Sequence, residues 1–280
     1  MKDYQSLLFP YAYNILGSAE DAKDAIQDVI LKYTIKGVQP ENEKNYLIRG
    51  VINQSINLKR QKQRTQPEET WLPEPVATEK SDVGLELREL VSYSLLYLLE
   101  RLNPKERAVF ILKEAFAYTH EEIADVLSIT IEHSRKLLSR ANQKVHQKEK
   151  RVPRPNTLKE QFQSIEQFTS AIRQKDLDTL HQLLSKEITF YADGGDKIKV
   201  VKKYCTGIQE VADLLLLVYH KYQKNYTVKP FIMNHQPALL YYYRDQLTTC
   251  QVFELEEGTS RVKRISVVLD PEKLKNLKNL

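Results

Sequence analysis

Apolar residues recur at helical spacing, every three or four positions, along the first half of the chain. Polar residues fill the positions between them, so each stretch predicts an amphipathic helix with one buried face. Gly17, Pro104 and small polar residues mark the boundaries between these stretches. The predicted helices cover residues 4–16, 19–33, 45–64, 85–99, 104–116, 119–127 and 131–145. The last four are predicted to pack as one compact domain.

A second pattern begins near residue 158. Helices are predicted over 158–174, 177–184 and 207–224. Between and after them, runs of alternating or β-branched residues predict strands. The predicted strands cover residues 188–192, 198–201, 226–234, 238–244, 247–255 and 261–269. Helices followed by a run of hairpin-linked strands indicate an α+β fold.

The stretch 119–145 has the pattern of a helix-turn-helix. Thr119 and Glu122 form a capping-box pair, and Thr130 can cap the second helix. The outer face of the second helix would enter a major groove, where Arg and Lys can bond guanine edges or phosphates. That face consists of Glu132, His133, Arg135, Lys136, Ser139 and Arg140. The alternative is an ordinary helical hairpin with a solvated face, and Ser128 stands in the turn where Gly is common.

Two earlier helices carry polar faces of opposite character. The helix 19–33 has an outer face formed by Asp21, Asp24, Gln27 and Asp28. Acidic residues there form either a solvated helix start or an acidic docking face. The helix 45–64 ends in the basic run 59–64, and one polar side of it is formed by Asn53, Asn57, Arg60 and Arg64. Asn can pair with bases, so this side is a second candidate for nucleic-acid contact, with a solvated helix end as the alternative.

Net charge, cysteine usage and the length of apolar runs exclude several classes of protein. The 280 residues carry a formal net charge of only +5, so basic residues must cluster if nucleic acid is the partner. Cys205 and Cys250 form no CxxC pair, which excludes a disulfide framework or a cysteine zinc site and suits a reducing cytoplasm. No signal peptide is expected, and the longest apolar run, 214–219, is too short to span a bilayer. We expect neither a metal nor a cofactor.

Several stretches carry a family resemblance. Residues 16–22 read LGSAEDA, 24–29 read DAIQDV, 102–110 read LNPKERAVF and 134–141 read SRKLLSRA. They resemble regions two and four of bacterial RNA polymerase sigma factors of the extracytoplasmic-function group. The resemblance implies that helix 19–33 grips core polymerase, that helix 45–64 captures and opens the downstream promoter element, and that region four reads the upstream element. Tyr46 stands where the family often has Trp, so we assign it no melting role.

Residues 66–81 read as a linker, because Pro67, Pro73 and Pro75 exclude regular structure. Residues 71–75 read WLPEP, 193–197 read DGGDK and 270–274 read DPEKL. Together they resemble the sigma subgroup with a fused SnoaL-like (NTF2-like) domain, although Asp196 stands where that subgroup usually has a third Gly. We expect this third domain to contact the linker or regions two and four, with Trp71 docked in a pocket. The expected contact residues are Trp71, Leu72, Pro73, Asp193, Gly194 and Gly195.

The SnoaL-like fold also includes cyclases and isomerases that need a buried acid–base pair. The candidates for such a pair are Asp213, His220, His235 and Asp245, while His181 lies on a helix predicted to be exposed. They form no recognisable constellation, and membership of a fold does not imply its chemistry, so we expect no enzymatic activity. Tyr241 to Tyr243 alternate along a strand, so some of their rings face the pocket.

The chain is therefore predicted to be a multidomain bacterial sigma factor of the cytoplasm. Its predicted domains are region two at 1–65, a linker at 66–84, region four at 85–150, a basic hinge at 151–157 and an α+β SnoaL-like cone at 158–280. The predicted partners are core RNA polymerase and promoter DNA, with a small ligand of the cone left open. The sequence also leaves open whether the cone restrains or assists transcription. The alternatives are a one-component DNA-binding regulator with a ligand-binding cone, and an enzyme fused to a DNA-binding domain.

Overall fold

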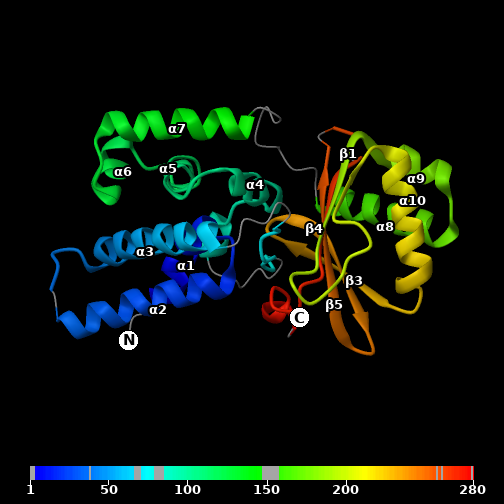
Figure 1. Cartoon of the computed structure of the whole chain (residues 1–280), viewed down its shortest axis with the longest axis horizontal. Helices are drawn as coiled ribbons and strands as arrows, with labels where there is room; N and C mark the ends of the chain where they lie inside the picture. Colours follow the sequence, from blue (N-terminus) through cyan, green and yellow to red (C-terminus); the bar gives the residue numbers. More distant parts are fainter. Residues whose placement is uncertain are drawn as a thin grey trace. The chain divides into compact units, whose positions relative to one another are not determined.

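A computed structural model describes residues 4–37, 39–65, 71–78, 85–146, 158–256, 258–259, 261–278 and 280. The chain forms two compact units (Figure 1). One unit consists of Met1–Glu68 and Lys80–Lys150, and the other of Glu69–Glu79 and Arg151–Leu280. The linker segment 71–78 thus belongs with the C-terminal unit. The predicted hinge 151–157 lies outside the described residues.

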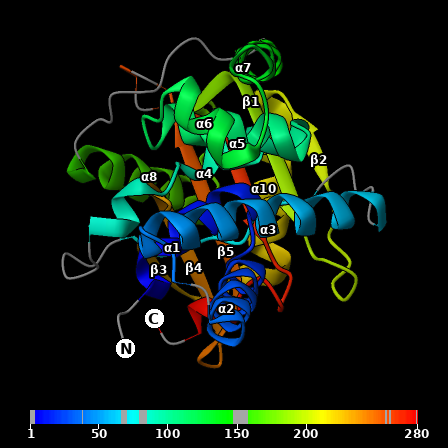
Figure 2. The same ribbon diagram turned by 90° about the vertical axis from the view of Figure 1, so that its left-hand side faces the viewer.

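The N-terminal unit is helical in all of its described elements. Its long helices are α1 (Tyr4–Leu16), α2 (Ala19–Lys36), α3 (Glu43–Thr65), α5 (Pro104–Glu114), α6 (His120–Leu127) and α7 (Ile131–His146). The predicted boundaries are set by caps: the Ser18 hydroxyl accepts from Asp21 N–H, and Asn103 and Glu106 form a capping box around Pro104. In both Figure 1 and Figure 2, α3 lies between α2 and the pair α5–α6.

The prediction of one helix over 85–99 is wrong. The structure has a 3₁₀ turn η1 (Leu85–Glu89), the short helix α4 (Tyr93–Leu98) and a second 3₁₀ turn η2 (Leu99–Arg101). Asn14 of α1 provides the reason, because its side chain donates to Glu89 O at 2.9 Å and accepts from Val91 N–H at 3.1 Å. These bonds replace helical ones, and the Ser92 hydroxyl then caps α4.

The C-terminal unit is an α+β fold, as predicted. Its six-stranded sheet has the order β2-β1-β6-β5-β4-β3, with β1 and β6 parallel and the other neighbours antiparallel. The strands are β1 (Leu184–Asp193), β2 (Tyr204–Thr206), β3 (Thr227–Met233), β4 (Gln236–Tyr243), β5 (Gln246–Leu255) and β6 (Val262–Val268). The helices α8 (Leu158–Gln174), α9 (Leu177–Leu183) and α10 (Ile208–Val218) cover one face of the sheet (Figure 1). Phe168 and Phe253 meet edge to face in the core between them, 5.3 Å apart.

Two predictions for this unit need correction. Residues 198–201 form no strand, because Ile198 N–H bonds back to Gly194 O at 3.1 Å and the segment serves the turn after β1. The strand next to β1 at this edge of the sheet is β2, where Cys205 pairs with Phe190. The helix predicted over 207–224 is α10 followed by a π-helical turn at Tyr219–Gln223. No helix in the described parts of either unit is long and apolar enough to cross a membrane.

Candidate functional site

The predicted helix-turn-helix is present in α6 and α7. Thr119 and Glu122 exchange both bonds of a capping box, and Thr130 Oγ1 accepts from His133 N–H at 3.1 Å. Ser128 adopts the left-handed conformation, φ 51°, that Gly often supplies at this position. His120 Nδ1 lies 2.9 Å from the Ser134 hydroxyl and ties the two helices together. The turn therefore holds its geometry without Gly.

The outer face of α7 presents the residues predicted to contact DNA. All six lie on one helix, and all are exposed except His133, which is half-buried. Lys136 pairs with Glu132 at 2.6 Å one turn away. Arg140 approaches Glu106 at 3.8 Å. Arg135 is exposed and forms no salt bridge with any residue that the structure describes. It is therefore the cation of this face that is most available to an external partner.

The predicted downstream face of α3 is partly engaged within the helical unit. The Asn53 side chain donates to Arg49 O at 2.9 Å and to Val126 O of α6 at 3.1 Å. Arg49, which the sequence reading missed, lies 3.3 Å from Asp125 and donates to the Ser128 hydroxyl at 2.9 Å. These bonds hold α3 against the turn of the hairpin. The remaining three residues of the face, Asn57, Arg60 and Arg64, are exposed or half-buried.

The acidic face of α2 is divided between free and paired side chains. Asp24 and Gln27 are exposed, whereas Asp28 accepts from the Gln54 side chain at 3.1 Å and Asp21 pairs with Lys62 at 2.6 Å. The same helix also exposes Leu31 and Ile35, the latter with 75% of its surface accessible. The sequence reading missed these two apolar positions, although both interrupt a polar helix end.

A buried charge cluster, which we call the helical junction, joins α3 to η2 and α5. The Lys59 ammonium donates to Leu16 O at 3.0 Å and to Glu100 Oε2 at 2.6 Å. Arg107, fully buried, donates to the same carboxylate and, through Nε, to Asn14 O at 2.9 Å. Burial lowers the pKa of Lys59 to about 8, with Glu100 acting against that shift. Burial alone would raise the pKa of Glu100, but Arg107 and Lys59 hold it below its usual value.

Residues 71–75 of the linker lie against the C-terminal domain in an arrangement that we call the linker dock. The N–H of Leu72 donates to Asp193 Oδ2 at 2.8 Å, and its carbonyl accepts from Lys273 Nζ at 2.7 Å. Lys273 and Asp193 are themselves paired at 2.6 Å, and both are buried. Leu72 is 0% exposed. Trp71 is only half-buried and lies under the Lys273 ammonium, 4.3 Å from the ring centre.

The next part of the linker continues along the sheet. Val76 N–H donates to the Asn234 side chain, and Asn234 N–H donates to Val76 O, both at 2.9 Å. Ala77 forms an antiparallel bridge with Met233, and Thr78 N–H donates to Ile232 O at 2.9 Å. The linker therefore adds a short strand segment at the end of edge strand β3. The sequence reading missed Asn234, which carries a left-handed backbone, φ 46°.

Gly194 and Gly195 form the turn that follows β1. A Cβ on Gly194 would lie 2.0 Å from Ile198 O, and one on Gly195 would lie 2.5 Å from Asp270 Oδ2. Gly195 also has φ 57°. The two glycines shape the turn that presents Asp193, whose other carboxylate oxygen accepts from Gly195 N–H at 2.9 Å. Asp196 keeps a negative φ, so this turn does not need a third Gly.

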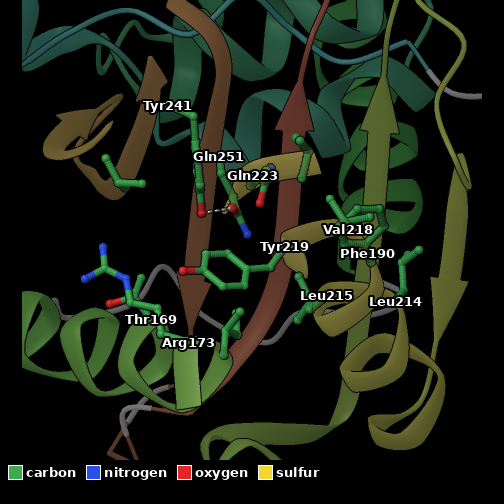
Figure 3. Close-up of a pocket in the computed structure, with 13 residues that line it drawn as sticks. Thr169, Arg173, Phe190, Leu214, Leu215, Val218, Tyr219, Gln223, Tyr241 and Gln251 are labelled. Atoms are coloured by element: carbon green, nitrogen blue, oxygen red, sulfur yellow. Dashed lines mark hydrogen bonds between the residues drawn. The ribbon is translucent and has the colours of Figure 1, made fainter. Parts of the chain in front are cut away.

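A cavity of about 40 Å³ lies between α8, α10 and the sheet (Figure 3). Tyr241 faces it, as the alternation predicted for one of these rings, and its hydroxyl donates to Gln251 Oε1 at 2.8 Å. None of Asp213, His220, His235 and Asp245 lines this cavity. His181 is half-buried rather than exposed. Across the described parts of the chain, no group of three or more His, Cys, Asp or Glu residues could hold a metal ion.

Comparison with known families finds two matches in the helical unit. Residues 1–65 match the model of sigma-70 region 2, and residues 92–145 match that of sigma-70 region 4. The first match contains α1, α2 and α3, and the second contains α4 to α7 up to residue 145. Both candidate nucleic-acid faces and the acidic face thus lie within matched regions.

Relatives extend the likeness along the chain. The ECF RNA polymerase sigma factor SigJ of Mycobacterium tuberculosis is 27% identical over 226 residues, covering 77% of this chain and 70% of the relative. A probable ECF RNA polymerase sigma factor, SigI, of the same organism is 24% identical over 284 residues, covering 98% of this chain and 93% of its own length. The crystal structure of SigJ superposes with a TM-score of 0.76 over 97% of this chain and 96% of that one, at 21% identity. That superposition shows a common fold for the two chains.

Proposed function

We propose, from the premise that this chain is an extracytoplasmic-function RNA polymerase sigma factor, which of its surfaces bind its partners, and we propose that its C-terminal domain has the SnoaL-like (NTF2-like) fold. As a sigma factor it binds core RNA polymerase and directs promoter recognition and transcription initiation. A one-component regulator is not favoured, because such a protein has no need of the region-two match over residues 1–65. We expect it to act in the cytoplasm, with core polymerase, and we expect no catalysis from its third domain.

We propose that α7 reads the upstream promoter element, with Arg135 as its main base contact. Arg135 is exposed on the outer face of the second hairpin helix and forms no salt bridge within the described ranges of the chain, which is the observation that supports this role. Arg135→Ala should cost ~1–3 kcal/mol of binding and relax base preference at one position. Fluorescence anisotropy with specific and random duplexes measures both effects at fixed salt. Equal weakening on both duplexes would make Arg135 a phosphate contact only.

We propose that α2 docks on core polymerase through Asp24 and Gln27, with Asp21 and Asp28 beside them. The double reversal Asp24→Lys, Asp28→Lys should abolish assembly with purified core enzyme while leaving the helix content intact, because both side chains face outward. Reversing Asp178 of α9, which is also exposed, provides a matched control. Unchanged co-purification of the double variant would remove this face from the polymerase interface.

We propose that the third domain modulates transcription through the linker dock. Residues 66–84 connect α3 to η1, and the segment 71–78 is hydrogen-bonded to the third domain. A sigma factor must separate regions two and four to reach both promoter elements. Each extended residue spans ~3.3–3.6 Å, so fixing 71–78 shortens the length of linker that can extend. The dock therefore restrains the separation.

Truncations test whether the third domain, or only its last segment, is needed for this modulation. Ending the chain at Asn156 removes the whole third domain, and ending it at Leu269 removes only the segment that contains Lys273. Promoter-specific transcription with core polymerase should differ among full-length, tail-trimmed and domain-deleted proteins at matched concentration and salt. Equal transcription from all three would rule the modulation out. A small ligand in the cone, if one acts, would enter through the cavity lined by Tyr241 and Gln251.

A further inference from the structure

The cavity of the third domain has one apolar wall and one polar corner. Its apolar lining comes from Ile172, Phe190, Leu214, Leu215, Val218, Val228 and Val267. The polar lining comes from Thr169, Arg173, Tyr219, Gln223, Tyr241 and Gln251. Figure 3 shows Tyr219, Tyr241 and Gln251 converging on the middle of the cavity, with Gln223 beside Gln251. About 40 Å³ is room for roughly three water-sized groups, so the buried part of an occupant must be small.

Two donor groups of the polar corner have no acceptor within hydrogen-bond distance in the described part of the chain. Gln251 is 4% exposed, and its Oε1 is occupied by the Tyr241 hydroxyl, which leaves its amide N–H groups directed into the cavity. Neither these N–H groups nor the Tyr219 hydroxyl has a hydrogen-bond partner among the residues that the structure describes. A buried amide left without partners is costly, which favours an occupant that supplies an acceptor.

The charge of the corner is positive. Arg173 of α8 stands at the cavity and forms no salt bridge within the described part of the chain. Burial raises the pKa of Tyr241, and the positive charge of Arg173 acts in the opposite direction. No Asp, Glu, His or Lys lines the cavity. A ligand that pairs with Arg173 must therefore bring the negative charge, and its oxygens can accept from the Gln251 amide.

We propose that this cavity binds a small organic acid, with its carboxylate held by Gln251 and Arg173 and a short apolar body lying against Phe190, Leu215 and Val267. An effect of the bound acid on transcription rests on the proposed modulation by the third domain. Binding of the acid to the cavity does not rest on that proposal. Helices α8 and α10 both line the cavity, so an occupant would join the two helices that cover the sheet.

The test is titration of the full-length protein, followed by calorimetry or by NMR of the ligand. The probes are acetate, propanoate and butanoate at millimolar concentration, with propanamide as the neutral partner of equal size to propanoate. The acids are expected to bind more tightly than the amide. Gln251→Leu and Arg173→Gln should each weaken acid binding about tenfold or more, because each removes a charge-assisted bond. Arg261→Gln, an exposed arginine away from the cavity, should bind as the unmodified chain does.

Absence of binding by all three acids, equal binding of acid and amide, or unchanged affinity in both variants would overturn the proposal. Arg173 is exposed, so Arg173→Gln keeps the test valid even if Gln251→Leu fails to fold. Transcription with and without the bound acid separates the two proposals. Binding without an effect on transcription leaves the site standing and counts against modulation. Modulation by the third domain without acid binding leaves only the ligand site refuted.

Discussion

The helical junction and the linker dock both depend on a buried lysine that binds one backbone carbonyl and one carboxylate. In the junction, Lys59 binds Leu16 O and Glu100, and in the dock Lys273 binds Leu72 O and Asp193. The difference is in the charge count. Glu100 serves two cations, because Arg107 shares it, whereas Asp193 serves one and also accepts two backbone N–H groups. In the dock one cation thus meets one carboxylate, whereas in the junction two buried cations share one carboxylate, and Asp21 also acts on Lys59.

The helical junction and the linker dock therefore differ in how strongly each should hold together distant parts of the chain. An ion pair with all of its bonds made can remain buried at little cost, but an extra buried cation lowers the stability of the state that holds it. The junction joins α3 of region two to η2 and α5 of region four. The proposed modulation requires these regions to separate on a promoter, and a junction in which two buried cations share one carboxylate suits a contact that opens. The linker dock, in which Asp193 pairs with a single cation, suits a contact that stays formed until residues 71–75 leave the C-terminal domain.

Removing the shared carboxylate should have the largest effect. Glu100→Gln leaves Lys59 and Arg107 buried without an anion, which should destabilise the compact helical unit by about 3–5 kcal/mol. Urea denaturation measures the loss in free energy of unfolding, and small-angle scattering shows whether regions two and four separate instead. Glu114→Gln, on the exposed side of α5, should change neither quantity. Unchanged stability and size for Glu100→Gln would mean that the shared carboxylate does not hold Lys59 and Arg107 in the folded unit.

Removing Lys273, the single cation of the linker dock, should lower the free energy of unfolding somewhat less than Glu100→Gln does. Lys273→Met leaves the Asp193 carboxylate with its two backbone donors but without its ammonium, for a loss of about 3 kcal/mol in the C-terminal unit. Chemical denaturation followed by Trp71 fluorescence reports this unit. The matched control is Lys275→Met, since Lys275 pairs with Glu272 on the surface. Equal stability of the two variants would contradict the structural role given to Lys273.

The smallest predicted effect is a pH dependence confined to the junction. The pKa of Lys59 falls from an ordinary 10.5 to about 8, first through burial. Between those values the unfolded chain binds more protons, so the free energy of unfolding rises with pH, by about 1 kcal/mol from pH 7 to pH 9 for this group. Denaturation curves at several pH values, compared with those of Lys59→Met, isolate the effect. Parallel pH profiles for the two proteins would show that Lys59 does not titrate in this range.

Local signals predicted the helices well, because each cap lies within a few residues of what it caps. Thr119 with Glu122 and Asn103 with Pro104 are examples, and both are present in the structure. The helix predicted over 85–99 failed because Asn14, far away in sequence, takes over its backbone bonds. The order of strands was not predictable either, since β1 pairs with β6 across most of the domain.

The structural roles of Lys59 and Lys273 could not be predicted either, because their partners lie far away in the sequence. Lys59 opens a run of basic residues that reads as a DNA-facing helix end, and only burial against Glu100 and Leu16 shows its structural role. Lys273 stands 201 positions from Leu72, whose carbonyl it binds. WLPEP and the Asp193 turn were identified from resemblance, but the sequence favoured Trp71 as the anchor. The structure instead buries Leu72 completely and leaves Trp71 half-exposed.

The most direct test of the linker dock as a restraint is promoter-specific transcription by a full-length variant with an undocked linker. Leu72→Asp places a carboxylate in the buried site beside Asp193, and it alters no residue of the third domain's own core. Leu217→Asp makes the same change at an exposed position of α10. With purified core polymerase, Leu72→Asp is expected to raise transcription about tenfold, as release of a restraint worth ~1.4 kcal/mol would do, while Leu217→Asp matches the unmodified chain. Transcription from Leu72→Asp that equals or falls below both would contradict the proposal that the docked linker restrains this sigma factor.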